Sequence, residues 1–261
     1  MIKPLMKYDL KNMLKILIYF YAVSIGIAII TRLIKLGDEI FSIYIIGQVF
    51  AGITYSAIAN ILINTFTNIL RVFITNFYKD ESYLTHTLPV RKKDLIVSKY
   101  LSAVITVFLS VAVSFICIFI VHYSPEFIDA IKALLISSTS TFKTPLWLFI
   151  TLIIMLLFVE LFALLSFAFN AVIIAHTYSE KRMLKGFLWF ILIYFASMLI
   201  MLLLAVVVGL ISGNLSTLFS NSLSESLLLI LTITSLVTYI GLSIASFYLS
   251  KKLFSKGVNI D

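Results

Sequence analysis

Charged residues are scarce in this 261-residue sequence. Asp, Glu, Lys and Arg together make up only 12% of it, while 61% of the residues are hydrophobic. Soluble domains average about a quarter charged and about half apolar residues, so a soluble fold could not bury this much apolar surface. We therefore expect an integral membrane protein whose main solvent is lipid. The net charge of +8 fits positive flanks on the cytosolic side of the membrane better than nucleic-acid binding.

The residues and motifs on which catalysis depends are also scarce. The single cysteine, Cys117, lies in an apolar run and can form no disulfide within the chain. The sequence has no G-x-x-x-x-G-K-[ST] phosphate loop, no G-x-S-x-G and no H-E-x-x-H. The three histidines, His86, His122 and His176, fall on different sides of the membrane in the topology below, so we do not expect them to share a metal. We predict no catalytic residue, no metal and no cofactor in this chain.

Six apolar runs are long enough to cross roughly 30 Å of hydrocarbon as helices, which takes about 20 residues. The predicted fold class is therefore all-α, an integral membrane protein with one transmembrane domain over residues 1–261. The expected spans are 15–34, 45–72, 96–122, 146–175, 186–211 and 227–249. The spans over 45–72 and 146–175 are longer than needed, so we expect them to tilt or to extend beyond the bilayer.

Positively charged residues indicate the orientation. Most of the 20 Lys and Arg residues lie at the termini and in alternate loops, whereas Arg32, Lys35, Lys132 and Lys143 lie on the other side. By the positive-inside rule, the N- and C-termini should both be cytosolic. The abundance of Ile, Lys, Asn, Phe and Tyr, with little Gly and Pro, is typical of an AT-rich bacterial genome. We therefore predict a multi-pass protein of a bacterial plasma membrane.

The first residues suggest an additional helix before the first span. Lys3, Lys7, Lys11 and Lys15 are spaced by four and would share one helical face. The apolar residues of this segment gather on another face: Leu5, Met6, Leu10, Met13 and Leu14. This pattern predicts an amphipathic helix over residues 1–14 that lies on the inner leaflet. A merely positive flank is the alternative.

Polar residues inside the spans are few. Ser56, Asn60, Asn64 and Asn68 recur every four residues along the second span, so each is turned by about 40° from the one before. Amides in hydrocarbon require partners, so these residues form either a polar wall of a translocation path or hydrogen bonds between helices. Glu160 lies in the middle of the fourth span. It is either a contact for substrate or protons, or a neutral carboxyl bonded across a helix or subunit contact.

The segment between the second and third spans is the longest charge-rich stretch. Asp80 and Glu81 at its start suit the positive end of a helix, and Pro89 would end that helix. One apolar face would come from residues at near-helical spacing, Tyr83, Leu84, Thr87 and Leu88. We predict a short amphipathic helix on the cytosolic side. Such a helix either docks into a cleft of a cytosolic partner or lies on the membrane without one.

The same segment carries a resemblance to a known family. The run Phe77-Tyr78-Lys79-Asp80-Glu81-Ser82-Tyr83-Leu84-Thr85-His86-Thr87-Leu88-Pro89-Val90, with Lys93-Asp94-Leu95 and Ser98-Lys99 after it, resembles permeases of type-two ATP-binding-cassette transporters. In that family an acidic, aromatic stretch leads to a proline turn, a basic patch and the next span. The tail Ser250-Lys251-Lys252-Leu253-Phe254-Ser255-Lys256 is similar to the ends of these permeases, and six spans with cytosolic termini match the family.

The resemblance implies a function and a set of partners. The protein would be the membrane subunit of an exporter for a peptide, lipid or drug-like cargo, paired with a second permease subunit, identical or related. Two cytosolic ATPase subunits would hold the ATP and Mg²⁺, and the N-terminal segment would be the interfacial elbow helix. The coupling helix that sits in the ATPase would present Asp80, Glu81, Tyr83, Leu84, Thr87 and Leu88.

Three other functions stay open. A secondary transporter or channel working alone would predict internal repeats and broken helices, but the sequence shows no clear repeat, and Gly and Pro are sparse within the spans. A membrane enzyme would need a catalytic constellation that the sequence does not offer. A regulatory or assembly subunit is the third alternative.

Overall fold

The computed structural model describes residues 2–37, 41–79, 81–87, 89–125, 127–130, 132–133, 145–178, 180–213 and 225–255, and every named element within these ranges is a helix. The long helices are α1 (Ile2–Lys35), α2 (Phe41–Tyr78), α4 (Lys92–His122), α6 (Leu146–Ala175), α7 (Arg182–Ile211) and α9 (Glu225–Ser255), and the short helix α3 covers Ser82–Thr87. Six of these helices are long and apolar enough to cross a membrane. This confirms the predicted all-α fold with six candidate spans, as expected of a multi-pass membrane protein.

The helices mostly exceed the spans predicted from the sequence. Only α6 has the predicted limits, and α1 differs most because it begins at Ile2 instead of near residue 15. Pro4 lies in its first turn, where proline is tolerated, and nothing after it breaks the helix. Residues 2–14 are therefore the first part of one continuous helix instead of a separate one, and their location on the inner leaflet stays a prediction. Lys3, Lys7, Lys11 and Lys15 are all exposed on this helix.

The chain divides into two compact units, Met1–Ile131 and Lys132–Asp261, which we call unit 1 and unit 2. Unit 1 contains α1, α2, α3 and α4, and unit 2 contains α6, α7 and α9. Each unit is described by itself. The single transmembrane domain predicted over residues 1–261 stays a prediction.

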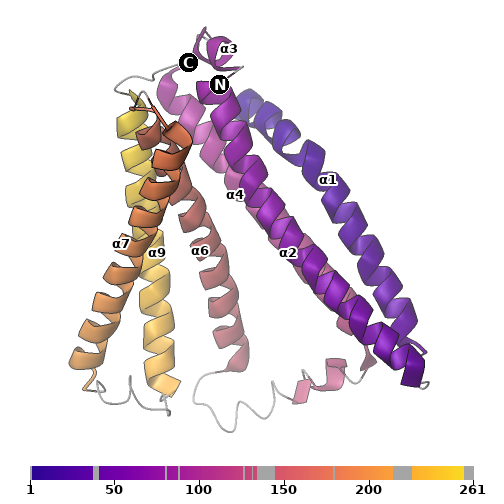
Figure 1. The fold of residues 1–261 in the computed structure, drawn as a ribbon. Helices are drawn as coiled ribbons and strands as arrows, with labels where there is room; N and C mark the ends of the chain where they lie inside the picture. The colour runs from indigo at the N-terminus through magenta and orange to yellow at the C-terminus, as the bar shows by residue number, and fades with distance from the viewer. Residues whose placement is uncertain are drawn as a thin grey trace. The chain divides into compact units, whose positions relative to one another are not determined.

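In unit 1, α1, α2 and α4 pack against one another, and α3 packs against α2. Figure 1 shows α3 at the end of the unit where α1 and α4 begin. Burial on α1 recurs every three or four residues, at Asp9, Met13, Leu17, Tyr21, Ser24, Ala28 and Thr31. This spacing keeps the buried residues on one face of the helix.

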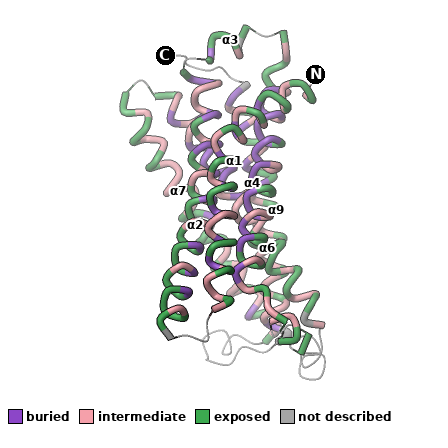
Figure 2. Tube along the Cα trace, turned by 90° about the vertical axis from the view of Figure 1, so that its right-hand side faces the viewer, coloured by how far each residue is buried: buried purple, intermediate pink, exposed green. Residues whose placement is uncertain are grey.

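Small hydroxyl residues form the main buried stripe of α4. They are spaced by four, at Ser98, Ser102, Thr106, Ser110 and Ser114. Figure 2 shows buried residues recurring along α1 and α4. The Ser110 hydroxyl is 2.6 Å from the Tyr21 hydroxyl of α1 and 2.7 Å from the Thr65 hydroxyl of α2. Small residues let helices approach closely in a membrane, so this stripe determines how tightly α4 packs in unit 1.

In unit 2, α6, α7 and α9 also pack against one another. The buried Asn170 of α6 joins α9: its amide nitrogen donates to the Ser246 carbonyl at 3.1 Å and to the Ser246 hydroxyl, and the Ser250 hydroxyl donates to its amide oxygen at 2.6 Å. Between α6 and α7, a Cβ on Gly186 would lie 3.3 Å from the Cβ of Ala175. These contacts fix α6 against both of its neighbours.

Candidate functional site

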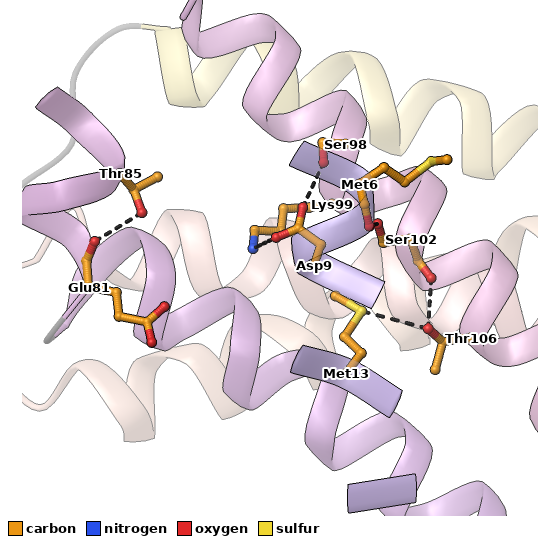
Figure 3. Close-up of polar contacts among 9 residues, drawn as sticks. All are labelled: Met6, Asp9, Met13, Glu81, Thr85, Ser98, Lys99, Ser102 and Thr106. Carbon is orange, nitrogen blue, oxygen red and sulfur yellow. Dashed lines mark hydrogen bonds and ion pairs between the residues drawn. The ribbon is translucent and has the colours of Figure 1, made fainter. Parts of the chain in front are cut away.

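A buried ion pair joins the start of α1 to the start of α4. The Lys99 ammonium donates to Asp9 Oδ1, and the Ser98 hydroxyl donates to Asp9 Oδ2 at 2.6 Å (Figure 3). Asp9 is 8% exposed and Lys99 only 2%. Buried charges are tolerated when a partner is close and their other hydrogen-bonding groups are occupied. The pair therefore holds α1 and α4 in one register.

Asn76, in the last turn of α2, extends the ion pair toward α3. In the amide orientation that its neighbours require, its oxygen accepts from the Lys99 ammonium. Its nitrogen then donates to the Val72 carbonyl at 3.0 Å and to Glu81 Oε2 at 2.8 Å. Glu81 directly precedes α3. A continuous set of polar contacts thus runs from α1 through α4 and α2 to the start of α3.

The surroundings of Lys99 satisfy its charge. An ammonium has three N–H donors, and two of them bond Asp9 and Asn76. Its nitrogen also lies 5.7 Å from the centroid of the Phe77 ring, within the range of a cation–π interaction. Phe77 packs edge-on against Phe73 with their centroids 4.9 Å apart, and both are fully buried. The charge is therefore enclosed by a carboxylate, an amide and an aromatic face.

The ion pair lies near the ends at which α1 and α4 begin. With a rise of 1.5 Å per residue, Lys99 is about 35 Å along α4 from His122, and Asp9 is about 39 Å along α1 from Lys35. Both distances exceed the roughly 30 Å of hydrocarbon. If the far ends of α1 and α4 lie at the opposite membrane surface, the ion pair lies at the level of the lipid headgroups.

The short helix α3 is fixed at its start. The Ser82 amide donates to the Lys79 carbonyl at 2.7 Å, and Ser82 is buried. Thr85 donates to the Glu81 carbonyl through its amide at 3.0 Å and its hydroxyl at 2.9 Å (Figure 3). Tyr83 is 74% exposed and Leu84 is 66% exposed. The helix thus has an anchored start and an uncovered apolar surface.

The predicted coupling residues divide into two groups. Glu81, Tyr83, Leu84 and Thr87 lie in the described part of the chain, and all four are exposed, with the Thr87 hydroxyl donating to the Leu84 carbonyl at 3.0 Å. Asp80 and Leu88 lie outside the described residues. A helix is present where the sequence predicts one, although its contact with an ATPase stays a prediction.

The four polar residues predicted to line one wall of α2 have different surroundings. Asn68 is buried and donates to the Met13 carbonyl of α1 at 2.5 Å. Asn60 and Asn64 donate within α2, to the Ser56 carbonyl at 3.1 Å and the Asn60 carbonyl at 2.8 Å. Ser56 and Asn60 are exposed and Asn64 is partly buried. Bonding between helices thus accounts for the Asn68 nitrogen, although its buried Oδ1 has no hydrogen-bond partner among the described residues. The other three residues lie at a face that α1 and α4 leave uncovered.

Glu160 is partly buried on α6. It interacts electrostatically with Tyr239 of α9, and Tyr239 also interacts with Tyr194 of α7. Glu160 therefore lies near α9. Its side chain forms no ion pair with any residue that the structure describes. Both interpretations of Glu160, the substrate or proton contact and the bonded neutral carboxyl, stay open.

Asp9 and Lys99 were not recognised as a pair from the sequence. The available signals were an aspartate among four N-terminal lysines and a lysine inside an apolar span. The positive-inside rule uses Lys99 only as a marker of the cytosolic side. The serine and threonine repeat of α4 was likewise overlooked, although its spacing of four is visible in the sequence.

Within the described ranges, no group of three or more His, Cys, Asp or Glu residues is arranged to hold a metal ion. The contacts described above link α1, α2 and α4 to an exposed helix. Comparisons of the chain with protein-family models, with curated proteins and with solved structures found no match.

Proposed function

We propose that this chain is the membrane permease subunit of an ATP-driven exporter, moved by a separate ATP-binding-cassette ATPase that binds α3. One observation carries the proposal. The exposed Tyr83 and Leu84 belong to a helix whose start is connected through Glu81 and Asn76 to the buried Asp9–Lys99 pair. A surface loop without a partner would need neither the apolar exposure nor the buried connection.

The connection suits the transmission of movement. A partner that binds Tyr83 and Leu84 would pull on α3, and Glu81 would pass the displacement to Asn76 of α2 and Lys99 of α4. Lys99 in turn contacts Asp9 of α1. All three long helices of unit 1 would therefore respond to one docking event.

In this proposal, a second protein is the energy source. The sequence contains no phosphate loop, so ATP and Mg²⁺ would be held by the partner. The ATPase is expected on the cytosolic side, where the positive-inside rule places α3. This assignment makes the chain a multi-pass subunit of a bacterial plasma membrane complex with no catalytic activity of its own.

The uncovered polar face of α2 supports a path along this helix. Ser56, Asn60 and Asn64 would be costly to expose to hydrocarbon, so water, cargo or protein should cover them. A second permease subunit, identical or related, would complete the path. The cargo class expected from the resemblance is a peptide, a lipid or a drug-like molecule.

Co-purification tests the proposal. The tagged chain, isolated from its native host in mild detergent, should bring down an ATPase that contains a phosphate loop and hydrolyses ATP. Changing Tyr83→Asp or Leu84→Asp should weaken this association by about 30-fold, because a central apolar contact is worth about 2 kcal/mol. The measurement is the amount of ATPase bound per permease.

Tyr8→Asp is the matched control. Tyr8 is 73% exposed, almost the same as Tyr83, and lies on α1 in the same unit. This variant should keep the ATPase. The proposal is wrong if no ATPase accompanies the unchanged chain, or if the variants at Tyr83 and Tyr8 retain equal amounts.

A further inference from the structure

We infer that Lys99 is a positioning residue for α3: together with Asp9 it holds Asn76, and through Asn76 it holds Glu81 and the start of the helix. The geometric inference concerns this chain alone, while its meaning for transport rests on the proposed function. The contacts that carry it are the Lys99–Asp9 ion pair, the bond from Lys99 to the Asn76 oxygen, and the 2.8 Å bond from Asn76 to Glu81.

The order of these contacts gives Lys99 its role. The Asn76 amide has an oxygen on one side and a nitrogen on the other, and only one orientation places the nitrogen toward Glu81. Lys99 has only donors, so the amide oxygen has to face it. The Val72 carbonyl and Glu81 both accept from the amide nitrogen, so Lys99 is one of three groups that fix the orientation in which Asn76 donates to Glu81.

Direct attraction strengthens the effect. Lys99 also interacts electrostatically with Glu81, so the buried ammonium attracts the start of α3 as well as orienting the amide. Asp9 keeps the ammonium at this position from the opposite side. The position of α3 thus depends on Asp9 of α1. No hydrogen bond that the structure describes joins Asp9 to α3.

A purely structural ion pair would explain the same burial, so the experiment has to separate stability from positioning. Removing one charge strands the other in a buried site and is strongly destabilising, whereas replacing both partners with apolar side chains of similar size is often neutral. The double variant Asp9→Leu with Lys99→Met should therefore fold. It also removes the only donor that the Asn76 oxygen faces among the contacts described above.

Spin-label distances measure the position of α3 in the full chain without its ATPase. The labels are placed at Tyr83→Cys on α3 and Tyr19→Cys on α1, two exposed positions, in a Cys117→Ala background that removes the only native cysteine. The parent should give one narrow distance distribution. In the double variant, the fraction of molecules outside that peak should rise about tenfold, the effect of losing one hydrogen bond to a charged group.

Variants at Glu81 provide an independent readout. Glu81→Gln keeps an oxygen that accepts from Asn76 and should retain most of the narrow peak, while Glu81→Leu should lose it. Arg91→Gln is the control because it removes the Arg91–Asp94 ion pair at the start of α4, which does not involve α3, and it should leave the distribution unchanged.

Each outcome decides one of the two claims. Equally narrow distributions in the parent, the double variant and Glu81→Leu would overturn the positioning role. A broadened distribution in a chain that never binds an ATPase would support the positioning role and reject the proposed function. If both hold, the double variant should bind the ATPase but transmit ATP hydrolysis to transport less efficiently than the parent.

Discussion

Two asparagines show how the same side chain has different roles in this molecule. Asn170 is buried, and its amide joins α6 to α9 through Ser246 and Ser250. Asn64 is only partly buried, and its amide donates to its own helix. In both places the amide nitrogen donates within the protein, but only the bonds of Asn170 hold two helices together.

Asn170→Leu should lower the stability of unit 2 by about 2 kcal/mol, because several buried hydrogen bonds are lost and each is worth about 0.5–1.5 kcal/mol net. The measurement is thermal unfolding in detergent followed by tryptophan fluorescence, since both tryptophans, Trp147 and Trp189, lie in unit 2. Thr151→Leu is the matched control and should change stability little, because Thr151 is exposed on α6 and its hydroxyl bonds the Leu148 carbonyl of the same helix. Equal midpoints for the two variants would contradict the role assigned to Asn170.

Only part of the residue-scale detail could be predicted from the sequence. A spacing of four turns each residue by about 40° from the previous one, so Asn68 is turned by about 120° from Ser56. That rotation moves Asn68 onto the buried face of α2 while Ser56 stays exposed. The periodicity was readable, but the direction of the buried face depends on which helices pack there. The Asp9–Lys99 pair could not be predicted for the same reason, since its residues lie 90 positions apart.

At the scale of elements, close packing of α4 depends on side-chain size more than on apolar content. One buried row of α4 consists of hydroxyl residues, and its phenylalanines Phe108, Phe115 and Phe119 are exposed, while Leu95, Ile96 and Tyr100 are buried near its start. Helices in lipid gain little from burying apolar groups, because lipid is equally apolar, so small residues and hydrogen bonds decide the contact. Hydropathy located α4 correctly but could not show which of its faces meets α1.

Ser110→Leu should separate α4 from α1 and α2. The larger side chain would overfill a fully buried position, which costs about 1–3 kcal/mol, and would break the contacts with the Tyr21 and Thr65 hydroxyls. A thiol-reactive dye measures the effect, because Cys117 is fully buried in unit 1 and reacts only when the unit opens. Ser56→Leu is the same change at an exposed position of α2. It should leave unchanged the midpoint temperature at which Cys117 becomes labelled. A similar fall of this midpoint temperature in both variants would contradict the packing role of Ser110.

At the scale of the whole molecule, the number of spans was predictable and their grouping was not. Each span is apolar over most of its surface, so the sequence indicates its length but not its neighbours. The structure groups α1, α2 and α4 in one unit and α6, α7 and α9 in the other. Most helices also extend beyond the predicted spans. A hydropathy pattern ends with the run of apolar residues, whereas the helix continues into the polar residues that follow.

The orientation of the molecule yields a direct prediction. In a Cys117→Ala background, a cysteine at Tyr83 should resist a membrane-impermeant maleimide in intact cells and react after permeabilisation, because α3 is expected in the cytosol. A cysteine at Leu36, at the other end of unit 1, should react in intact cells. Both positions are exposed, so access to the reagent depends on the side of the membrane. Labelling of Tyr83→Cys in intact cells would contradict a cytosolic α3.

The unbroken length of α2 makes it a lever arm. Its 38 residues contain no proline and extend about 57 Å, with Asn76 close to one end. If the helix stays straight and pivots near Asn76, a tilt of about 5° carries the opposite end through about 5 Å. A small rotation delivered at α3 would thus be magnified at the far side of the bilayer, with no bend needed in between.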